Sequence, residues 1–178
     1  AKLARGAKFR CVKCGEVAST EHIKNEATSG RMNAKLMAIV AEGNNGRVYV
    51  SPDDIHIEAA RIEKPNDCPT GLLSEDRRAI WTPIYGLDTI DKLFTNRQLT
   101  ALVTFSELVS EAQEQATKDA KLLLGDDSTS LIDGGIGATA YGQAIGVYLA
   151  MLVDKLADSC NSCCPWEPVA QCPRQLFA

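Results

Sequence analysis

The feature that most constrains the fold of this chain is a pair of long helical patterns in its C-terminal half. In the first, apolar residues recur at helical spacing at Leu99, Leu102, Phe105, Val109, Ala112, Ala116 and Ala120. Residues 95–98, Thr-Asn-Arg-Gln, fit a capping box at the start of this pattern, and a polar loop follows from Gly125. The spacing therefore predicts a helix from about Asn96 that ends near Gly125.

The second pattern runs from about Ala138 to Asp158 and is apolar on nearly every side through its middle. Such a helix is usually central and buried, so we expect it to pack against the first helix inside the core. Its longest apolar run, residues 144–153 apart from Gly146, is too short to span a bilayer. The first residues lack the apolar stretch of a signal peptide. We therefore expect a soluble, cytoplasmic protein with no membrane partner.

The N-terminal part predicts small β elements. Residues 8–17 form a short β-knuckle around a Cys-x-x-Cys-Gly sequence, and residues 37–40 and 47–50 are two strands joined by a Gly/Asn-rich turn. A serine, a proline and two acids at 51–54 then start a helix that runs to about Ile62.

Taken together, these patterns predict an α+β fold that is mainly α. A small N-terminal β element with half a zinc ribbon precedes a helical domain with two long packed helices. The expected division is 1–50 for the ribbon and hairpin and 51–178 for the helical domain, with one continuous domain as the alternative. A length of 178 residues and a hydrophobic fraction of 45% predict a core that needs no disulfides.

The charge is unevenly distributed. Residues 1–36 carry eight cations, Lys2, Arg5, Lys8, Arg10, Lys13, Lys24, Arg31 and Lys35, and three acids, Glu16, Glu21 and Glu26. The difference is 8 − 3 = +5, which leaves 11 − 20 = −9 for the rest of the chain. A basic arm of this kind is typical of phosphate contact, and a solvated basic face is the alternative. Lys8, Arg10 and Lys13 are among the cations that could make this phosphate contact.

Cys11 and Cys14 have the spacing of half a zinc ribbon, since a structural zinc site normally takes four ligands. Three explanations remain open. The second pair lies outside this chain, or it is Cys160 with Cys163, or the first pair binds no metal. A redox role for Cys11 and Cys14 would require a helix N-terminus to lower a thiol pKa, and a glycine and polar residues follow instead.

Other motifs have simpler explanations. Cys160, Cys163 and Cys164 follow the apolar helix, where buried thiols acting as small hydrophobes are favoured over a metal half-site. The G-x-G-x-x-A sequence at 135–140 resembles a nucleotide-binding turn, but we interpret it as a flexible lead-in that lets the apolar helix pack closely. His22 has no partner at metal-type spacing, and neither has His56. No set of residues suggests a catalytic site.

Several segments, taken in order, resemble the adenine-specific DNA methylase-like proteins that contain a zinc ribbon. They are the Cys11–Cys14 knuckle, Gly30-Arg31-Met32, Thr82–Leu87, Leu93–Leu99, Thr104–Val109, Gly134–Tyr141 and Cys164-Pro165-Trp166. The resemblance covers nearly the whole chain. It implies an internal, non-catalytic segment between the AdoMet-binding glycine motif and an Asp-Pro-Pro-Tyr-type catalytic motif, both of which this chain lacks. A start without methionine fits a processed or excised piece.

The resemblance also implies the partners. The parent would transfer a methyl group from AdoMet to adenine N6 in DNA, and AdoMet would bind only to the full-length parent. This segment would contact the remainder of the methylase domain, reach DNA through the parent, and be inactive alone. Lys8, Arg10 and Lys13 would be its best candidates for contact with DNA. Two other functions remain as hypotheses: a non-enzymatic helical module that binds proteins, and a thiol redox protein.

Overall fold

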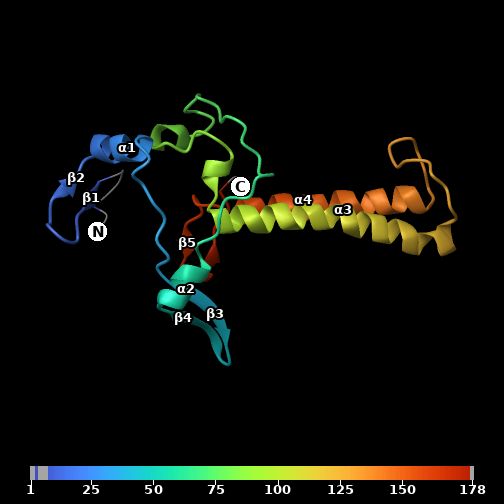
Figure 1. Ribbon diagram of the computed structural model, residues 1–178, viewed down its shortest axis with the longest axis horizontal. Helices are drawn as coiled ribbons and strands as arrows, with labels where there is room; N and C mark the ends of the chain where they lie inside the picture. The colour runs from blue at the N-terminus through green and yellow to red at the C-terminus, as the bar shows by residue number, and fades with distance from the viewer. Residues whose placement is uncertain (1–2, 4–7, 177–178) are drawn as a thin grey trace. The chain divides into compact units, whose positions relative to one another are not determined.

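The computed structural model of this chain describes Leu3 and residues 8–176 (Figure 1). The elements, in chain order, are β1 Phe9–Arg10, β2 Val17–Ala18, α1 Thr20–Thr28, β3 Ile39–Gly43, β4 Gly46–Val50, α2 Asp54–Ala59, η1 Thr82–Tyr85, η2 Asp91–Leu93, α3 Asn96–Leu124, α4 Ala138–Ser159, β5 Trp166–Glu167 and β6 Cys172–Pro173. Among these described residues, helices predominate and the strands form three separate antiparallel pairs, which confirms the predicted α+β, mainly α class.

The chain folds as two compact units. The first comprises the N-terminal segment through Ile62 together with Pro69–Thr95, and the second comprises Glu63–Cys68 together with the segment from Asn96 onward. The first is called the N-terminal unit and the second the helical unit, and each is described separately below.

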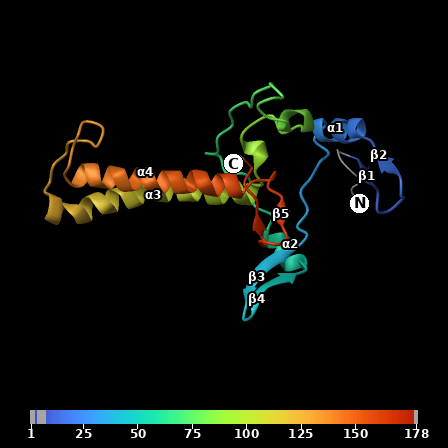
Figure 2. The same cartoon turned by 180° about the vertical axis from the view of Figure 1, so that it is seen from behind.

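The second unit is built on a hairpin of the two long helices, α3 and α4, which lie side by side in both views (Figures 1 and 2). Glycines on α4 make the close approach possible. A Cβ added at Gly142 would lie 2.8 Å from the Gln113 carbonyl oxygen and would also meet the Thr117 side chain. One added at Gly146 would meet the side-chain amide of Gln113. The predicted packing of the two helices is therefore confirmed.

The prediction that the apolar helix is central and buried is wrong. The buried residues of α4 are all small: Ala138, Ala140, Gly142 and Gly146. Several of its large side chains are exposed, among them Tyr148 at 69% and Leu152 at 64%, and none of its large side chains is fully buried. The reason is geometric, because a single neighbouring helix covers one stripe of α4 and leaves the other sides in solvent.

The first unit contains short elements held by local contacts. The Ser19 side chain accepts a hydrogen bond from the His22 backbone N–H and caps α1. The turn η1 packs against the C-terminal end of α1, where a Cβ added at Gly86 would lie 2.6 Å from the Ala27 carbonyl oxygen. Gly86 also has φ of +77°, a backbone conformation that suits glycine.

The predicted hairpin is present, with longer strands than the sequence suggested. β3 pairs antiparallel with β4 from Ile39 opposite Val50 to Gly43 opposite Gly46. The connecting residues are Asn44 and Asn45, a short turn of the kind that favours hairpins.

The helix expected from residue 51 to about 62 is shorter in the structure. It is α2, Asp54–Ala59, and its cap is Asp53 rather than Ser51. The Asp53 carboxylate accepts from the His56 backbone N–H at 2.9 Å, and the Asp53 N–H donates to the His56 ring at 3.3 Å. This reciprocal capping box sets the helix start two residues later than predicted.

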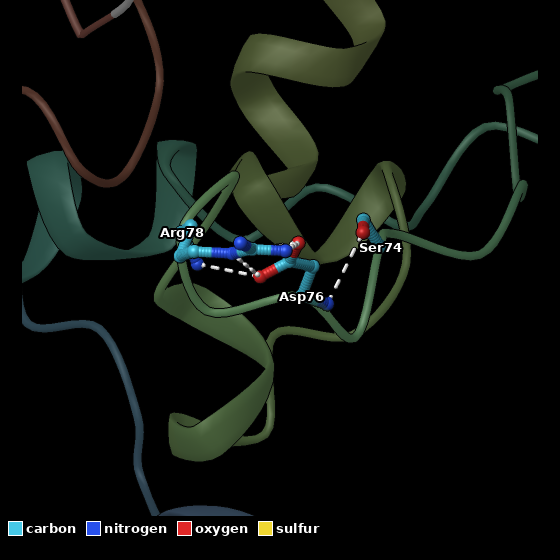
Figure 3. A network of polar contacts seen from close by, with 3 residues as sticks. All are labelled: Ser74, Asp76 and Arg78. Carbon is cyan, nitrogen blue, oxygen red and sulfur yellow. Dashed lines mark hydrogen bonds and ion pairs between the residues drawn. The ribbon is translucent and has the colours of Figure 1, made fainter.

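A polar network fixes the loop that precedes η1 (Figure 3). The Asp76 backbone N–H donates to Ser74 Oγ, and the Arg78 guanidinium grips the Asp76 carboxylate through Nε at 3.1 Å and Nη2 at 2.8 Å. The Arg78 side chain is 91% exposed, so this pair orders the loop and adds little stability.

Within the part of the chain that the structure describes, no helix is long and apolar enough to cross a membrane.

Candidate functional site

The Cys11–Cys14 knuckle is a tight turn between two very short strands. β1 pairs with β2 through Phe9 opposite Ala18 and Arg10 opposite Val17. The Cys11 N–H donates to the Glu16 carbonyl at 2.8 Å, and the Gly15 N–H donates to the Cys11 carbonyl at 3.1 Å. Gly15 has φ of +77°, which explains why a glycine follows the second cysteine.

Backbone N–H groups inside this turn point at sulfur. The Lys13 N–H donates to Cys11 Sγ at 3.4 Å. The pKa of the Cys11 thiol lies below its ordinary value. The largest cause is a hydrogen bond from the Cys14 backbone N–H, and the hydrogen bond from the Lys13 backbone N–H lowers the pKa further. Such donors stabilise a thiolate, which is the form that binds a metal. Both cysteines are exposed, so their sulfur atoms are accessible from solvent.

The lowered pKa alone does not separate a metal ligand from a redox thiol. A redox Cys-x-x-Cys normally has a helix N-terminus behind it, whereas the residues after Cys14 lead into strand β2. Within Leu3 and residues 8–176, no group of three or more His, Cys, Asp or Glu side chains is arranged to hold a metal ion. Among these described residues, Cys11 and Cys14 are therefore two thiols at metal-type spacing with no third or fourth ligand beside them.

The predicted DNA contacts lie on this knuckle. Lys8, Arg10 and Lys13 are all exposed. The Arg10 guanidinium also donates to the Gly15 carbonyl at 3.0 Å, so this side chain helps to close the turn. Sequence reasoning missed that second role, because nothing in the spacing of Arg10 and Gly15 indicates a contact. Lys2 and Arg5, the other cations of the predicted arm, lie outside the described residues.

The cysteines after α4 have the opposite environment. Burial raises the pKa of the Cys160 and Cys163 thiols, and the neighbouring Cys164 raises both further. The Cys164 thiol donates to the Asp158 carbonyl at 3.2 Å. The raised pKa of the Cys160 and Cys163 thiols favours their protonated form, whereas a metal binds the thiolate.

The glycine-rich sequence before α4 lies in a loop. Between α3 and α4, where residues 125–137 are all described, there is no strand of the kind that a nucleotide-binding turn requires. A Cβ added at Gly137 would lie 2.5 Å from the Asp127 Cβ, and one added at Gly135 would meet the Thr129 carbonyl. These two glycines allow the loop to fold back on itself.

The histidines have local roles. The His56 ring belongs to the capping box of α2, and the His22 N–H donates to the Ser19 cap. Neither forms part of a metal group among the described residues.

Comparison with models of protein families, with curated proteins and with solved structures finds no match to this chain.

Proposed function

We propose that this chain is a non-catalytic structural segment of an AdoMet-dependent adenine-specific DNA methyltransferase. In this role Cys11 and Cys14 supply half of a structural zinc site. Lys8, Arg10 and Lys13 meet DNA phosphates, and the helical unit contacts the remainder of the methylase domain. AdoMet binds elsewhere in the parent protein.

The observation that carries the proposal is the geometry of the knuckle. Two backbone N–H groups are directed at one exposed thiol, and a glycine with positive φ follows the second cysteine. A zinc ion bound there would hold the turn in place and would take no part in methyl transfer. Lys13 lies on the same turn as the cysteines and Arg10 on the strand that leads into it, so fixing the turn also fixes where this positive charge is presented.

The Thr82–Tyr85 segment has a supporting role in this proposal. It forms η1 against α1, and Lys24 Nζ lies 5.8 Å from the centre of the Tyr85 ring. Its sequence resembles the Asp-Pro-Pro-Tyr-type catalytic motif only superficially, because it has Pro83 and Tyr85 but neither the acid nor the paired prolines. We therefore expect the isolated chain to transfer no methyl group from labelled AdoMet to DNA.

DNA binding tests the role of the basic residues. We expect affinity for duplex DNA to fall steeply with added salt, because cations that neutralise phosphates release counterions. The triple variant K8Q/R10Q/K13Q should lower the slope of log affinity against log salt by about 3. A matched variant, K92Q/K121Q/K155Q, removes the same charge from other exposed positions and should leave the slope nearly unchanged. Equal losses in the two variants would contradict the assignment.

The reading frame on either side of this segment tests the family. The proposal expects a glycine-rich AdoMet motif upstream and an Asp-Pro-Pro-Tyr-type motif downstream. In the longer protein, zinc content measured by elemental analysis should fall on Cys11→Ser. If both motifs are absent from the flanks, the methylase assignment fails.

A second candidate function, a helical module that binds proteins, is favoured by a different observation. The two long helices leave large apolar side chains in solvent, including Leu123 at 88% exposure on α3. Contiguous exposed apolar surface commonly marks an interaction site. Binding through such a surface is insensitive to salt, which separates it from binding through the basic residues.

A further inference from the structure

One face of the α3–α4 hairpin is mainly apolar along its length. At one end of the hairpin, Phe105 and Leu108 from α3 and Leu149 and Leu152 from α4 line an open groove of about 450 Å³. At the other end, Leu123 from α3 and Tyr141 and Ile145 from α4 line a second groove of about 470 Å³, and Asp119 is a charged side chain in its lining. We call these two grooves together the groove face.

The helical repeat places the α3 part of this face in a single row. Phe105, Leu108, Ala112, Ala116 and Leu123 are separated by three, four, four and seven positions, which keeps them on one side of a helix with 3.6 residues per turn. The alanines lie at the centre of the row and the large side chains lie at its two ends. A surface with small residues at its centre allows another helix to approach closely.

The size of the groove face suits a stable partner. α4 has 22 residues and is about 33 Å long, and two adjacent helices are about 20 Å wide. The face therefore offers about 650 Å² per molecule, or about 1,300 Å² between two copies, which lies within the range of specific interfaces. A second hairpin laid on the face would complete a four-helix bundle, the usual way to bury two-sided apolar helices.

Charged residues at the edge of the groove face indicate that the second hairpin is that of another copy of this chain. Glu111 and Lys118 are exposed on the same side of α3, beside Leu108 and Ala112. The midpoint of Glu111 and Lys118 falls between residues 114 and 115, and the midpoint of the row from Phe105 to Leu123 is residue 114. A two-fold axis through this point would place each Glu111 opposite the Lys118 of the other copy. One symmetry operation therefore matches the apolar row and the Glu111–Lys118 pair together, although Lys118 Nζ also lies 4.0 Å from Glu114 Oε2 of its own chain.

The same axis gives α4 a consistent partner. Gly142 lies beside Thr117 and Gly146 beside Gln113, so the level of residue 114 on α3 corresponds to Ile145 on α4. Two copies would then bring Ile145 against Ile145, and Tyr141 of each copy near Leu149 of the other.

We propose that two copies of this chain associate through the groove face as an antiparallel, two-fold symmetric four-helix bundle. This inference rests on the second candidate function, because it names the partner of the apolar surface, and it is independent of the methylase proposal.

The primary test is the mass in solution. Sedimentation equilibrium of the full chain should give a reversible dimer, with twice the 19.2 kDa of one chain. Leu152→Glu should raise the dimer dissociation constant at least about a hundredfold, because it buries an unpaired charge in the interface. Val147→Glu is the matched control: it lies on the same helix, is also exposed, and is five positions or about 140° around the helix from Leu152. It should leave the dissociation constant nearly unchanged.

A charge swap tests the register. Glu111→Lys and Lys118→Glu should each weaken the dimer about fivefold by placing like charges opposite each other, and the double variant should restore it. Circular dichroism of each variant checks that the helices persist. If the double variant does not restore the weakened dimer, the antiparallel register is wrong. If Val147→Glu and Leu152→Glu weaken the dimer equally, the groove face is not the interface.

A monomer at all concentrations would overturn the dimer without removing the second candidate function. Fluorescence of the dye ANS then shows whether only the dimer fails or the interaction module fails as well. A monomer that binds the apolar dye ANS, with loss of dye binding in Leu152→Glu, leaves the groove face open to a different protein. A monomer that binds no dye has this face covered by its own chain, and then the interaction module fails as well.

Discussion

In the N-terminal unit single polar contacts fix short elements, whereas in the helical unit two long helices meet through a repeated fit of small residues. α1 and α2 have nine and six residues, and each depends on one capping side chain, Ser19 or Asp53. α3 and α4 have 29 and 22 residues, and glycines on α4 set their separation. Because starting a helix is costly and each added residue repays part of that cost, a short helix depends more on its caps than a long one does. Steric changes should therefore matter most in the helical unit, and single hydrogen bonds should matter most in the N-terminal unit.

The largest effect is expected from Gly142→Ala. The new Cβ would lie 2.8 Å from the Gln113 carbonyl oxygen and 3.0 Å from Thr117 Cβ, and neither atom can move away without separating the helices. We expect a loss of about 2 kcal/mol in the free energy of unfolding, as for an overpacked core. That loss exceeds the gain of about 1 kcal/mol that alanine brings to a helix interior. Urea unfolding followed by circular dichroism at 222 nm measures the change.

Gly146→Ala is the matched control on the same helix. Its nearest neighbour is the end of the Gln113 side chain, which can rotate away. The Gln113 side chain can rotate to relieve this contact, and alanine favours the helix more than glycine does. The free energy of unfolding should therefore stay within about 0.5 kcal/mol of the original. If both alanines destabilise the hairpin equally, close backbone approach at Gly142 is not what holds the helices together.

A smaller effect is expected in the N-terminal unit from Ser19→Ala. This change leaves the His22 N–H without its capping acceptor at 3.1 Å and should cost about 1 kcal/mol. Amide hydrogen exchange should show the loss of protection in α1 and no change in α3 or α4. Ser19→Asp keeps an acceptor at the cap and should retain protection. Equal loss in α4 would show that the two units do not unfold separately.

The cysteines provide the next comparison. Backbone N–H groups lower the pKa of the Cys11 thiol, while burial raises the pKa of the Cys160 and Cys163 thiols. Because the thiolate is the reactive form, iodoacetamide at neutral pH should alkylate Cys11 several-fold faster than either of the other two. Peptide mass spectrometry gives the rates. In urea the three rates should converge, and a difference that persists there would show that the fold does not cause it.

Sequence periodicity predicted the two helices of the helical unit well, but it did not predict which of their side chains are exposed. The spacing from Leu99 to Ala120 gave α3 nearly to the residue, and Ala138–Asp158 gave α4. Periodicity reports how apolar a helix is, but it does not report how many neighbours cover it, so the burial of α4 was predicted wrongly. The grooves needed both helices at once: Phe105 was visible in the α3 pattern, and its neighbour Leu152 came from a segment 47 positions away.

In the N-terminal unit the difficulty was of another kind. The cysteine spacing predicted the knuckle because its turn is local, and Gly15 indicated its geometry. The contact of Arg10 with the Gly15 carbonyl and the shift of the α2 cap from Ser51 to Asp53 could not be predicted. Several residues at 51–54 are competent caps, and the choice among them depends on His56, which returns the second hydrogen bond of the capping box.

The smallest effect is expected from acid at this cap. The hydrogen bond from the His56 backbone N–H is the largest cause that holds the pKa of the Asp53 carboxyl below its ordinary value. A lowered pKa in the folded state means that the stabilisation of α2 is complete above the ordinary carboxyl pKa and is lost as the pH falls through the lower, folded value. Below about pH 4, the His56 amide should therefore lose exchange protection.

Asp53→Asn separates charge from capping at this position. Asparagine is a competent cap without a titrating group, so the His56 amide should stay protected and its protection should no longer change with acid. α4 offers an internal reference in the other unit, because its cap, Gly137, has no side chain to protonate. An acid step of the same size at the start of α4, or one that survives in Asp53→Asn, would show that other carboxylates cause it. The dependence of the short helices on single polar contacts would then be weaker than the structure indicates.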